Sequence, residues 1–175
     1  MAKNDVRFAS MEGVSTRRYV VEDRVTSSAS ATIKAGEPVK VRGGETGNDL
    51  IILATGDPEI GTDIMVGIAA NESNETATVD GTVDVYVPLA MKTVLRTFAT
   101  TKSNVNTAAK RLALLNDTVT YDLTGTTFTV NENEGSDDNT HGLVIVDINT
   151  ATGEIDYVIK AQAMQGGSKV GQTID

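Results

Sequence analysis

Residues 62–98 read TDIMVGIAANESNETATVDGTVDVYVPLAMKTVLRTF. This stretch decides the fold class, because it holds two apolar runs of strand length joined by a polar connector. In the second run Val83, Val85 and Val87 alternate with more polar residues, and successive side chains on a strand point to opposite faces. We therefore expect a strand with one packed face and one face toward solvent.

The composition of the whole chain also favours strands. Aromatic residues make up 4% of the 175 residues and Trp is absent. Small and β-branched residues carry most of the apolar pattern, which suits the pleated surface of a sheet. The hydrophobic content of 39% is enough for one domain or two small ones. The prediction is a mainly β protein.

Further strand-like runs occur on both sides of the quoted stretch. Turn residues separate them, among them Ala35-Gly36, Asp57-Pro58, Asp80-Gly81 and an NTATG turn that ends at Gly153. The expected strands lie within residues 17–23, 32–34, 38–42, 49–56, 63–70, 82–88, 117–123, 126–130, 141–148 and 154–163.

One segment, residues 103–117, predicts a helix. Its apolar residues fall at helical spacing, either Asn104 or Asn106 is placed to cap its start, and Lys110 and Arg111 lie on the expected outer face. The LALL run inside it is also compatible with a strand. The residues of the expected apolar face are Val105, Ala108, Ala109, Leu112 and Leu115.

The pattern divides the chain into four parts. Residues 1–30 have weak periodicity and predict an extended N-terminal arm. Residues 31–92 predict a first β domain, whose last expected strand ends at Pro88, and residues 93–163 predict a second β module. The Gly-rich end, residues 164–175, predicts a flexible tail.

Charge is distributed unevenly along the chain. The net charge is −9, yet residues 1–42 hold eight Lys/Arg against five Asp/Glu. Between Gly43 and Met91 there are nine acidic residues and no basic ones. Such a face repels phosphate backbones, so we expect no nucleic-acid binding by the body. Acidity of this kind is also an ordinary solubility feature.

The sequence lacks the residues that several classes of protein need. The chain has no cysteine, which excludes disulfides, thiolate nucleophiles and Cys-based zinc sites. The N-terminus lacks the apolar core of a signal peptide, and the longest apolar run, residues 50–54, is too short to cross a bilayer. We expect that the protein makes no contact with a membrane and that it is made in a cytoplasm.

The one histidine, His141, follows a polar loop that contains Ser136, Asp137 and Asp138. A catalytic triad needs groups that converge from separate elements, and neighbours on one loop do not meet that need. The loop 131–140 also fails the EF-hand template, although another kind of calcium loop stays open. No glycine-rich phosphate motif occurs either. We therefore expect that the protein is not an enzyme, has no catalytic residue, and binds no metal and no cofactor.

The order of motifs resembles a known family. TIKAGEPVKV and DLIILATGD precede VGIAANESNET, and a Thr-rich link then leads to DGTVDVYVP. This succession, over residues 31–92, resembles the β-tulip core of tailed-phage capsid decoration (cement) proteins of the lambda head-stabilising type. Residues 93–163 look like the extra β-barrel or sandwich module of larger decoration proteins. The resemblance implies a β-tulip-like domain followed by a second small β module with one short helix.

The resemblance also implies a function. Proteins of that family are non-enzymatic, are usually homotrimers, and bind the major capsid protein on the outside of the virion at three-fold or quasi-three-fold sites. There they stabilise the shell against internal DNA pressure. In that family an N-terminal arm adds a strand to the shell protein. The candidate capsid-binding residues here are Arg7, Phe8, Arg17, Arg18, Tyr19, Val20 and Val21.

Alternatives remain open at this point. The segment that holds the seven candidates is also compatible with an ordinary first strand of the body. The whole chain is also compatible with another virion part, such as a head fibre base, a tail module or a baseplate module. A trimeric β-rich nucleotide hydrolase and a sugar- or calcium-dependent adhesion module are further alternatives, although the motifs of the hydrolase are not visible.

Overall fold

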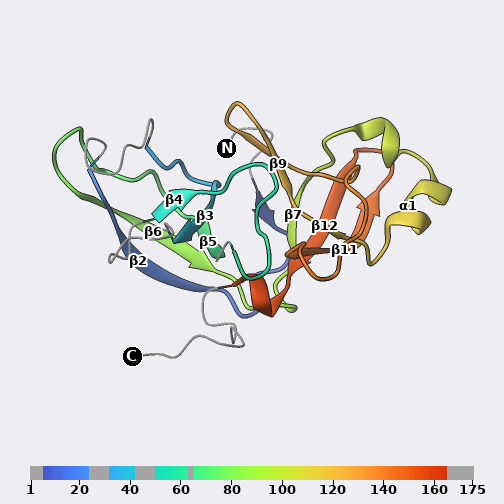
Figure 1. Ribbon diagram of the computed structural model, residues 1–175, viewed down its shortest axis with the longest axis horizontal. Helices are drawn as coiled ribbons and strands as arrows, with labels where there is room; N and C mark the ends of the chain where they lie inside the picture. The colour runs from blue at the N-terminus through green and yellow to red at the C-terminus, as the bar shows by residue number, and fades with distance from the viewer. Residues whose placement is uncertain (1–5, 24–31, 42–49, 63–64, 165–175) are drawn as a thin grey trace.

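The two apolar runs of the quoted stretch form neighbouring strands, β5 (Met65–Ala69) and β6 (Gly81–Val87). They lie inside one of two five-stranded antiparallel sheets that, with a hairpin and one short helix, make up this mainly β protein (Figure 1). The computed structural model describes residues 6–23, 32–41, 50–62 and 65–164. In this described part the strands form no closed barrel.

The first sheet has the order β2-β6-β5-β3-β4. Its other strands are β2 (Ser15–Val21), β3 (Pro38–Val41) and β4 (Leu50–Ile52). β2 pairs with β6 along its whole length. Its two edge strands, β2 and β4, also contact each other, so the sheet curls around its own apolar face.

The second sheet has the order β1-β7-β12-β11-β8 and lies toward the other end of the long axis (Figure 1). Beside it lies the hairpin of β9 and β10. The elements of this half are β1 (Arg7–Phe8), β7 (Leu95–Phe98), η1 (Lys102–Asn104), α1 (Ala108–Leu114), β8 (Thr118–Val119), β9 (Tyr121–Thr124), β10 (Thr127–Val130), β11 (Leu143–Asn149), β12 (Glu154–Ile159) and η2 (Ala161–Ala163).

Two hydrophobic cores meet at β5. A smaller core lies inside the curled first sheet and takes Val66 and Ala69 from β5. A larger core takes Met65 and Ile68 and continues into the second sheet and the hairpin. All five residues of β5 are buried, and Gly67 allows its close contact with β6, because a Cβ there would lie 2.1 Å from the carbonyl oxygen of Tyr86.

A turn after β4 connects the two halves through backbone hydrogen bonds. Tyr121 N–H donates to the carbonyl of Asp57 at 2.6 Å, and Gly142 N–H donates to that of Pro58 at 2.9 Å. The Asp57 carboxylate accepts from Lys40 Nζ at 2.6 Å and from Ala54 N–H at 2.6 Å. Both charged side chains are almost fully buried. This ion pair therefore sets the shape of the turn that the second half binds.

The expected β pattern is largely confirmed. In β6, Val83 and Val85 are buried, as the alternation predicted, and Gly153, at φ +81°, makes the β11–β12 turn. Two details differ. Residues 32–34 are not a strand, although Ile33 is bonded to Ser73. The strand β7 was not expected, because its LRTF sequence is too short to show a period.

The helix is shorter than predicted and is not amphipathic in its packing. Thr107, and neither of the expected asparagines, caps it by accepting from Lys110 N–H. None of its residues is buried, and Leu112 is 67% exposed. Val105 is buried, but it precedes the helix. The expected apolar face failed because the helix instead packs through Leu114 against the larger core and lies beside β11, where Val146 and Asp147 are exposed.

The N-terminal segment takes part in both sheets. The described part of residues 1–30 provides β1 to the second sheet and β2 to the first. At the other end Met164 is buried and forms a bridge with Met65, while the rest of the expected tail, 165–175, is outside the described residues.

Replacing Asp57 by Asn tests the role of the turn. The change leaves Lys40 buried beside a neutral group, and breaking one side of a buried pair costs about 3 kcal/mol or more. We expect the free energy of unfolding, measured by urea denaturation, to fall by that amount.

The matched control is Asp138→Asn. The carboxylate of Asp138 is 82% exposed, and the change removes its ion pair with Lys160. Exposed pairs contribute less than about 1 kcal/mol. Equal losses in the two variants would contradict the assigned role of Asp57.

Candidate docking surface

The strand β1 lies where the two sheets meet and connects them through opposite faces. Its residue Arg7 donates to Glu154 Oε1 on β12 at 2.6 Å and places its guanidinium 5.9 Å from the ring centroid of Phe98. Phe8, the next residue, packs edge-on against Tyr86 of β6 with centroids 5.6 Å apart. Strand alternation thus directs the cation to the second sheet and the ring to the first.

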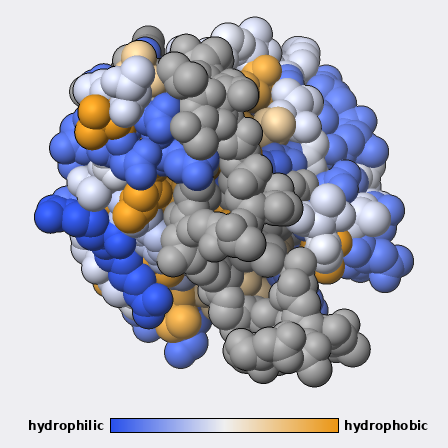
Figure 2. All heavy atoms as spheres, turned by 60° about the vertical axis from the view of Figure 1, so that its left-hand side comes forward, coloured by the Kyte–Doolittle hydropathy of each residue, from blue (hydrophilic) through white to orange (hydrophobic). Residues whose placement is uncertain are grey.

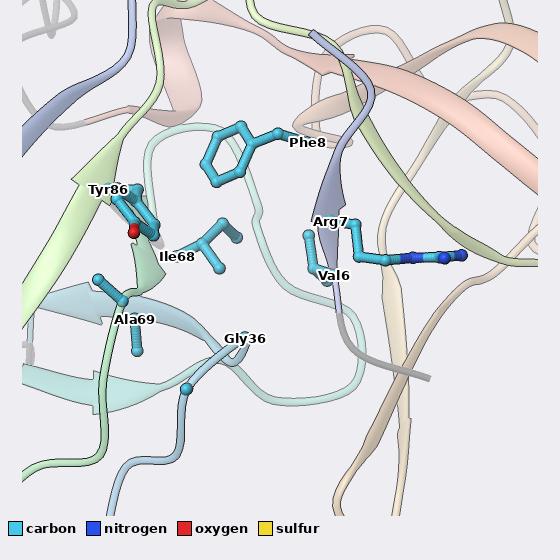
Figure 3. Close-up of a pocket in the computed structure, with 9 residues that line it drawn as sticks. Val6, Arg7, Phe8, Gly36, Ile68, Ala69 and Tyr86 are labelled. Atoms are coloured by element: carbon cyan, nitrogen blue, oxygen red, sulfur yellow. The ribbon is translucent and has the colours of Figure 1, made fainter. Parts of the chain in front are cut away.

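Beside β1 there is an apolar pocket of about 380 Å³. It is lined by β1 on one side and by β5, β6 and the Ala35-Gly36 turn on the other. In the close-up, Ile68 and Tyr86 face the segment Val6–Phe8 across the hollow, while the guanidinium of Arg7 points away from it (Figure 3). The pocket therefore offers apolar contact without a charged group.

The strand β2 is an edge of the first sheet and exposes most of its side chains. Arg18 binds Asp84 on β6 in a two-point contact, at 2.7 and 3.1 Å. Arg17 is exposed and forms no ion pair within the described part of the chain, and Val20 is 49% exposed. β2 therefore presents a cation and an apolar side chain to solvent.

The seven candidate residues fall into three groups. Arg7 and Phe8 lie at the junction of the sheets, and Arg17, Arg18 and Val20 lie on the surface of β2. Tyr19 and Val21 instead pack into the smaller core. The two positions differ from the other candidates because the sheet curls and covers their face near the end of β2.

A row of ion pairs crosses the outer face of the second sheet. Arg96 on β7 binds Asp156 on β12 through two contacts, at 2.5 and 2.7 Å. Arg111 of α1 binds Asp147 of β11 at 2.7 Å. Together with Arg7–Glu154, these pairs hold β1 and α1 against the sheet.

These contacts lower the pKa of several carboxyl groups. Burial of Glu154 opposes its ionisation, but hydrogen bonds from Arg7 and Thr152 outweigh it and lower its pKa. Hydrogen bonds from Arg111 and from Ile148 N–H lower the pKa of Asp147. On the first sheet, the hydrogen bond from Arg18 lowers the pKa of Asp84.

Two of the four carboxylates of the acidic loop 131–140, those of Glu132 and Glu134, turn inward to the protein. Glu132 Oε1 accepts from Thr101 N–H at 3.0 Å, and Glu134 accepts from the backbone and hydroxyl of Thr120. The other oxygen of Glu132 is buried without a hydrogen-bond partner among the described residues. Over that same part of the chain, no three acidic, histidine or cysteine side chains are placed to hold a metal ion.

The residues that suggest a triad do not form one. His141 Nδ1 lies 2.9 Å from the carbonyl of Thr118, and the Ser136 hydroxyl bonds to the same residue. Asp137 is held by the N–H of Asn139, which lowers its pKa, and Asp138 is bound to Lys160. Each of these groups thus has a structural partner in the loop or beside it.

Among the described residues, few large apolar side chains are exposed. In Figure 2 the coloured part of the face that comes forward mixes blue and orange residues with no continuous apolar area. No helix in the described ranges is both long and apolar enough to span a bilayer. The exposed large hydrophobic residues of this part are Met11, Val20, Val79, Leu89, Met91, Leu112 and Val146.

Several partners of the candidate residues were not expected from the sequence. Asp84 and Tyr86 belong to the predicted outward face of β6, so alternation could have identified them. Nothing in the sequence could have identified Glu154, because it lies 147 residues from Arg7.

Comparisons with protein-family models, with curated proteins and with solved structures find no match to this chain.

Acid should weaken the attachment of these strands. A carboxyl with a lowered pKa contributes stability that is complete above its ordinary value of about 4 and is lost as the pH falls through the lowered value. Asp84, Asp147 and Glu154 all have lowered pKa values. We expect the Tm, measured by circular dichroism, to be steady from pH 7 to 5 and to fall below pH 4.

The variant Asp147→Asn should have a lower Tm at pH 7 and a shallower decline in acid, because it has already lost the pair with Arg111. A decline as steep as that of the native chain would show that Asp147 does not contribute to it.

Proposed function

We propose that this protein is a capsid decoration protein of a tailed bacteriophage, which binds the outer surface of the shell as a homotrimer and stabilises it against internal DNA pressure. It is made in the host cytoplasm and acts on the virion. Its partner is the major capsid protein, at three-fold or quasi-three-fold sites. It needs no catalytic residue and no cofactor.

The arrangement of the first half supports this proposal. The motifs of the resemblance fall on β3, on β4, on β5 with its polar connector, and on β6, which are all members of one curled sheet. We propose that this sheet is a β-tulip-like domain and that the strands from β7 to β12 are the second small β module. The larger core includes residues of both parts and packs them against each other.

The observation that carries the proposal is an N-terminal segment that supplies an edge strand to each of the two sheets. β1 and β2 are both edge strands, although β2 also contacts β4 where the first sheet curls. Edge strands are the sites at which another chain extends a sheet. Arg17 and Val20 project from β2 as a cation and an apolar contact. These two positions lie on opposite faces of the strand, so a partner strand added at this edge would need a carboxylate on one of its faces and an apolar residue on the other.

Trimerisation would strengthen a weak attachment of this kind. Once one subunit is bound, the second and third bind at high effective concentration, which increases avidity on the order of a hundredfold. Three contacts spread over neighbouring capsid subunits would also oppose their separation. Shell stabilisation then follows from binding alone, without a chemical step.

Another virion part, such as a head fibre base, a tail module or a baseplate module, would use the same exposed edges. Copy number distinguishes the two functions. A decoration protein should be present at hundreds of copies spread over the capsid, whereas a fibre, tail or baseplate part should be confined to one ring or vertex. Reconstruction of native particles by electron microscopy measures this directly.

Charge reversal at Arg17 tests the attachment surface. Because Arg17 has no partner in the described part of the body, Arg17→Glu should leave the fold intact. A lost contact of about 1.4 kcal/mol corresponds to a tenfold change, so we expect affinity for empty capsids, measured by sedimentation, to fall about tenfold or more.

The matched control is Lys102→Glu, which makes the same charge change at an exposed position at the far end of the second sheet. Its affinity should equal that of the native chain. Equal loss in both variants would indicate a general charge effect, and no loss in Arg17→Glu would reject β2 as the attachment site.

A further inference from the structure

The short segment Val6–Phe8, which includes β1, packs into a site formed by the two sheets. Val6 is buried in the larger core, Arg7 reaches Glu154, and Phe8 contacts Tyr86. Its strand pairing with β7 covers only two positions. The two sheets do not depend on it for their own strand order, since β1 is the last strand at its edge.

The packing and hydrogen bonding of Val6–Phe8 within one chain are incomplete. The pocket of about 380 Å³ lies directly beside it. The Nε of Arg7 is buried and has no hydrogen-bond partner in the described part of the protein, and a buried donor without a partner costs free energy. A segment with short pairing and incomplete packing opens more easily than the sheets around it.

The linker that follows this segment, residues 9–14, lies beside exposed apolar side chains. Residues 9–14 pass from the second sheet to the first through a turn at Gly13, which has φ +72° and where a Cβ would lie 2.8 Å from the Cβ of Leu89. Glu12 O accepts from Thr93, so this turn adjoins the turn at residues 89–93. The two turns carry three of the exposed large apolar residues of the described chain, Met11, Leu89 and Met91.

The backbone at Met91 gives a second indication that this patch is used. Met91 has φ +59°, a conformation that suits glycine and that costs an ordinary residue about 1 kcal/mol or more. A glycine would therefore be more stable at this position. Retaining an exposed Met in a strained conformation is typical of a surface that makes a contact.

We propose that copies of this chain exchange their N-terminal segments, so that Val6–Phe8 of one copy occupies the site beside β7 of another. The site already matches this sequence, and identical segments exchange at low cost. Exchange places the second copy against the linker, where it covers Met11, Leu89 and Met91. The inference rests on the oligomer in the proposed function and identifies the contact that holds it together.

A disulfide trap tests the exchange. Ala9 N–H donates to Val94 O at 2.8 Å, so Ala9→Cys with Val94→Cys places two thiols across β1 and β7. The chain has no cysteine of its own. After oxidation of the folded full-length chain, we expect most of the protein to run on a non-reducing gel as species of two or more chains, and to return to one chain on reduction.

The control pair is Val144→Cys with Val158→Cys, which lie opposite each other on β11 and β12. These strands are joined by a short turn, so this disulfide must form within one chain. Oxidised Ala9→Cys/Val94→Cys protein that runs as a single chain, like the control, would overturn the exchange.

A charge-exchange experiment decides the matter without cysteine. In Arg7→Glu and in Glu154→Arg, the pair between β1 and β12 becomes a like-charge contact. When the two variants are refolded together, exchange restores opposite charges at every contact in which the segment of one variant occupies the site of the other. Native mass spectrometry should then show more mixed oligomers than random mixing produces, and random proportions would count against exchange.

The outcome separates this inference from the proposed function. Both measurements use the isolated protein, whereas attachment is measured as occupancy on empty capsids. A chain locked by an internal Ala9→Cys/Val94→Cys disulfide that still binds capsids would overturn the exchange and leave decoration standing. Linked chains that fail to bind capsids would support the exchange and reject decoration.

Discussion

The buried ion pair between Lys40 and Asp57 is the interaction on which the rest of the structure depends. It shapes the turn after β4, and the backbone of that turn then bonds to Tyr121 and lies beside Gly142. The two halves of the chain are thereby placed so that β5 has a core on each face. A buried pair of charges adds little net stability by itself, but it requires one geometry, because either charge without its partner is costly.

With the halves held in this way, the N-terminal segment can lie across both. Its alternating side chains reach Glu154 on one sheet and Tyr86 on the other. Residues that are close in sequence thus serve two distant parts of the molecule. A segment of this kind is well suited to assembly, because its contacts can be made within one chain or between chains without any change in their chemistry.

Parts of the fold and of the candidate surface were predictable from local pattern. Alternation along β6 identified Val83 and Val85 as core residues, and Gly153 marked a hairpin. The helix shows the limit of such reasoning, since the spacing of Leu112 predicted a buried face that no neighbouring element covers. Similarly, Tyr19 and Val21 looked available as anchors until the curl of the first sheet placed them in the smaller core.

The sequence by itself determined the strand content, the main turns and the contrast between residues 1–42, with their excess of basic residues, and the acidic remainder of the chain. These depend on residue type and on periods of a few residues. Only the tertiary structure decided that Arg7 meets Glu154, that β5 is covered on both faces, and that the exposed Met11, Leu89 and Met91 lie on adjoining turns. Such contacts join residues far apart along the chain, and their positions follow from how the two sheets pack, which no local pattern records.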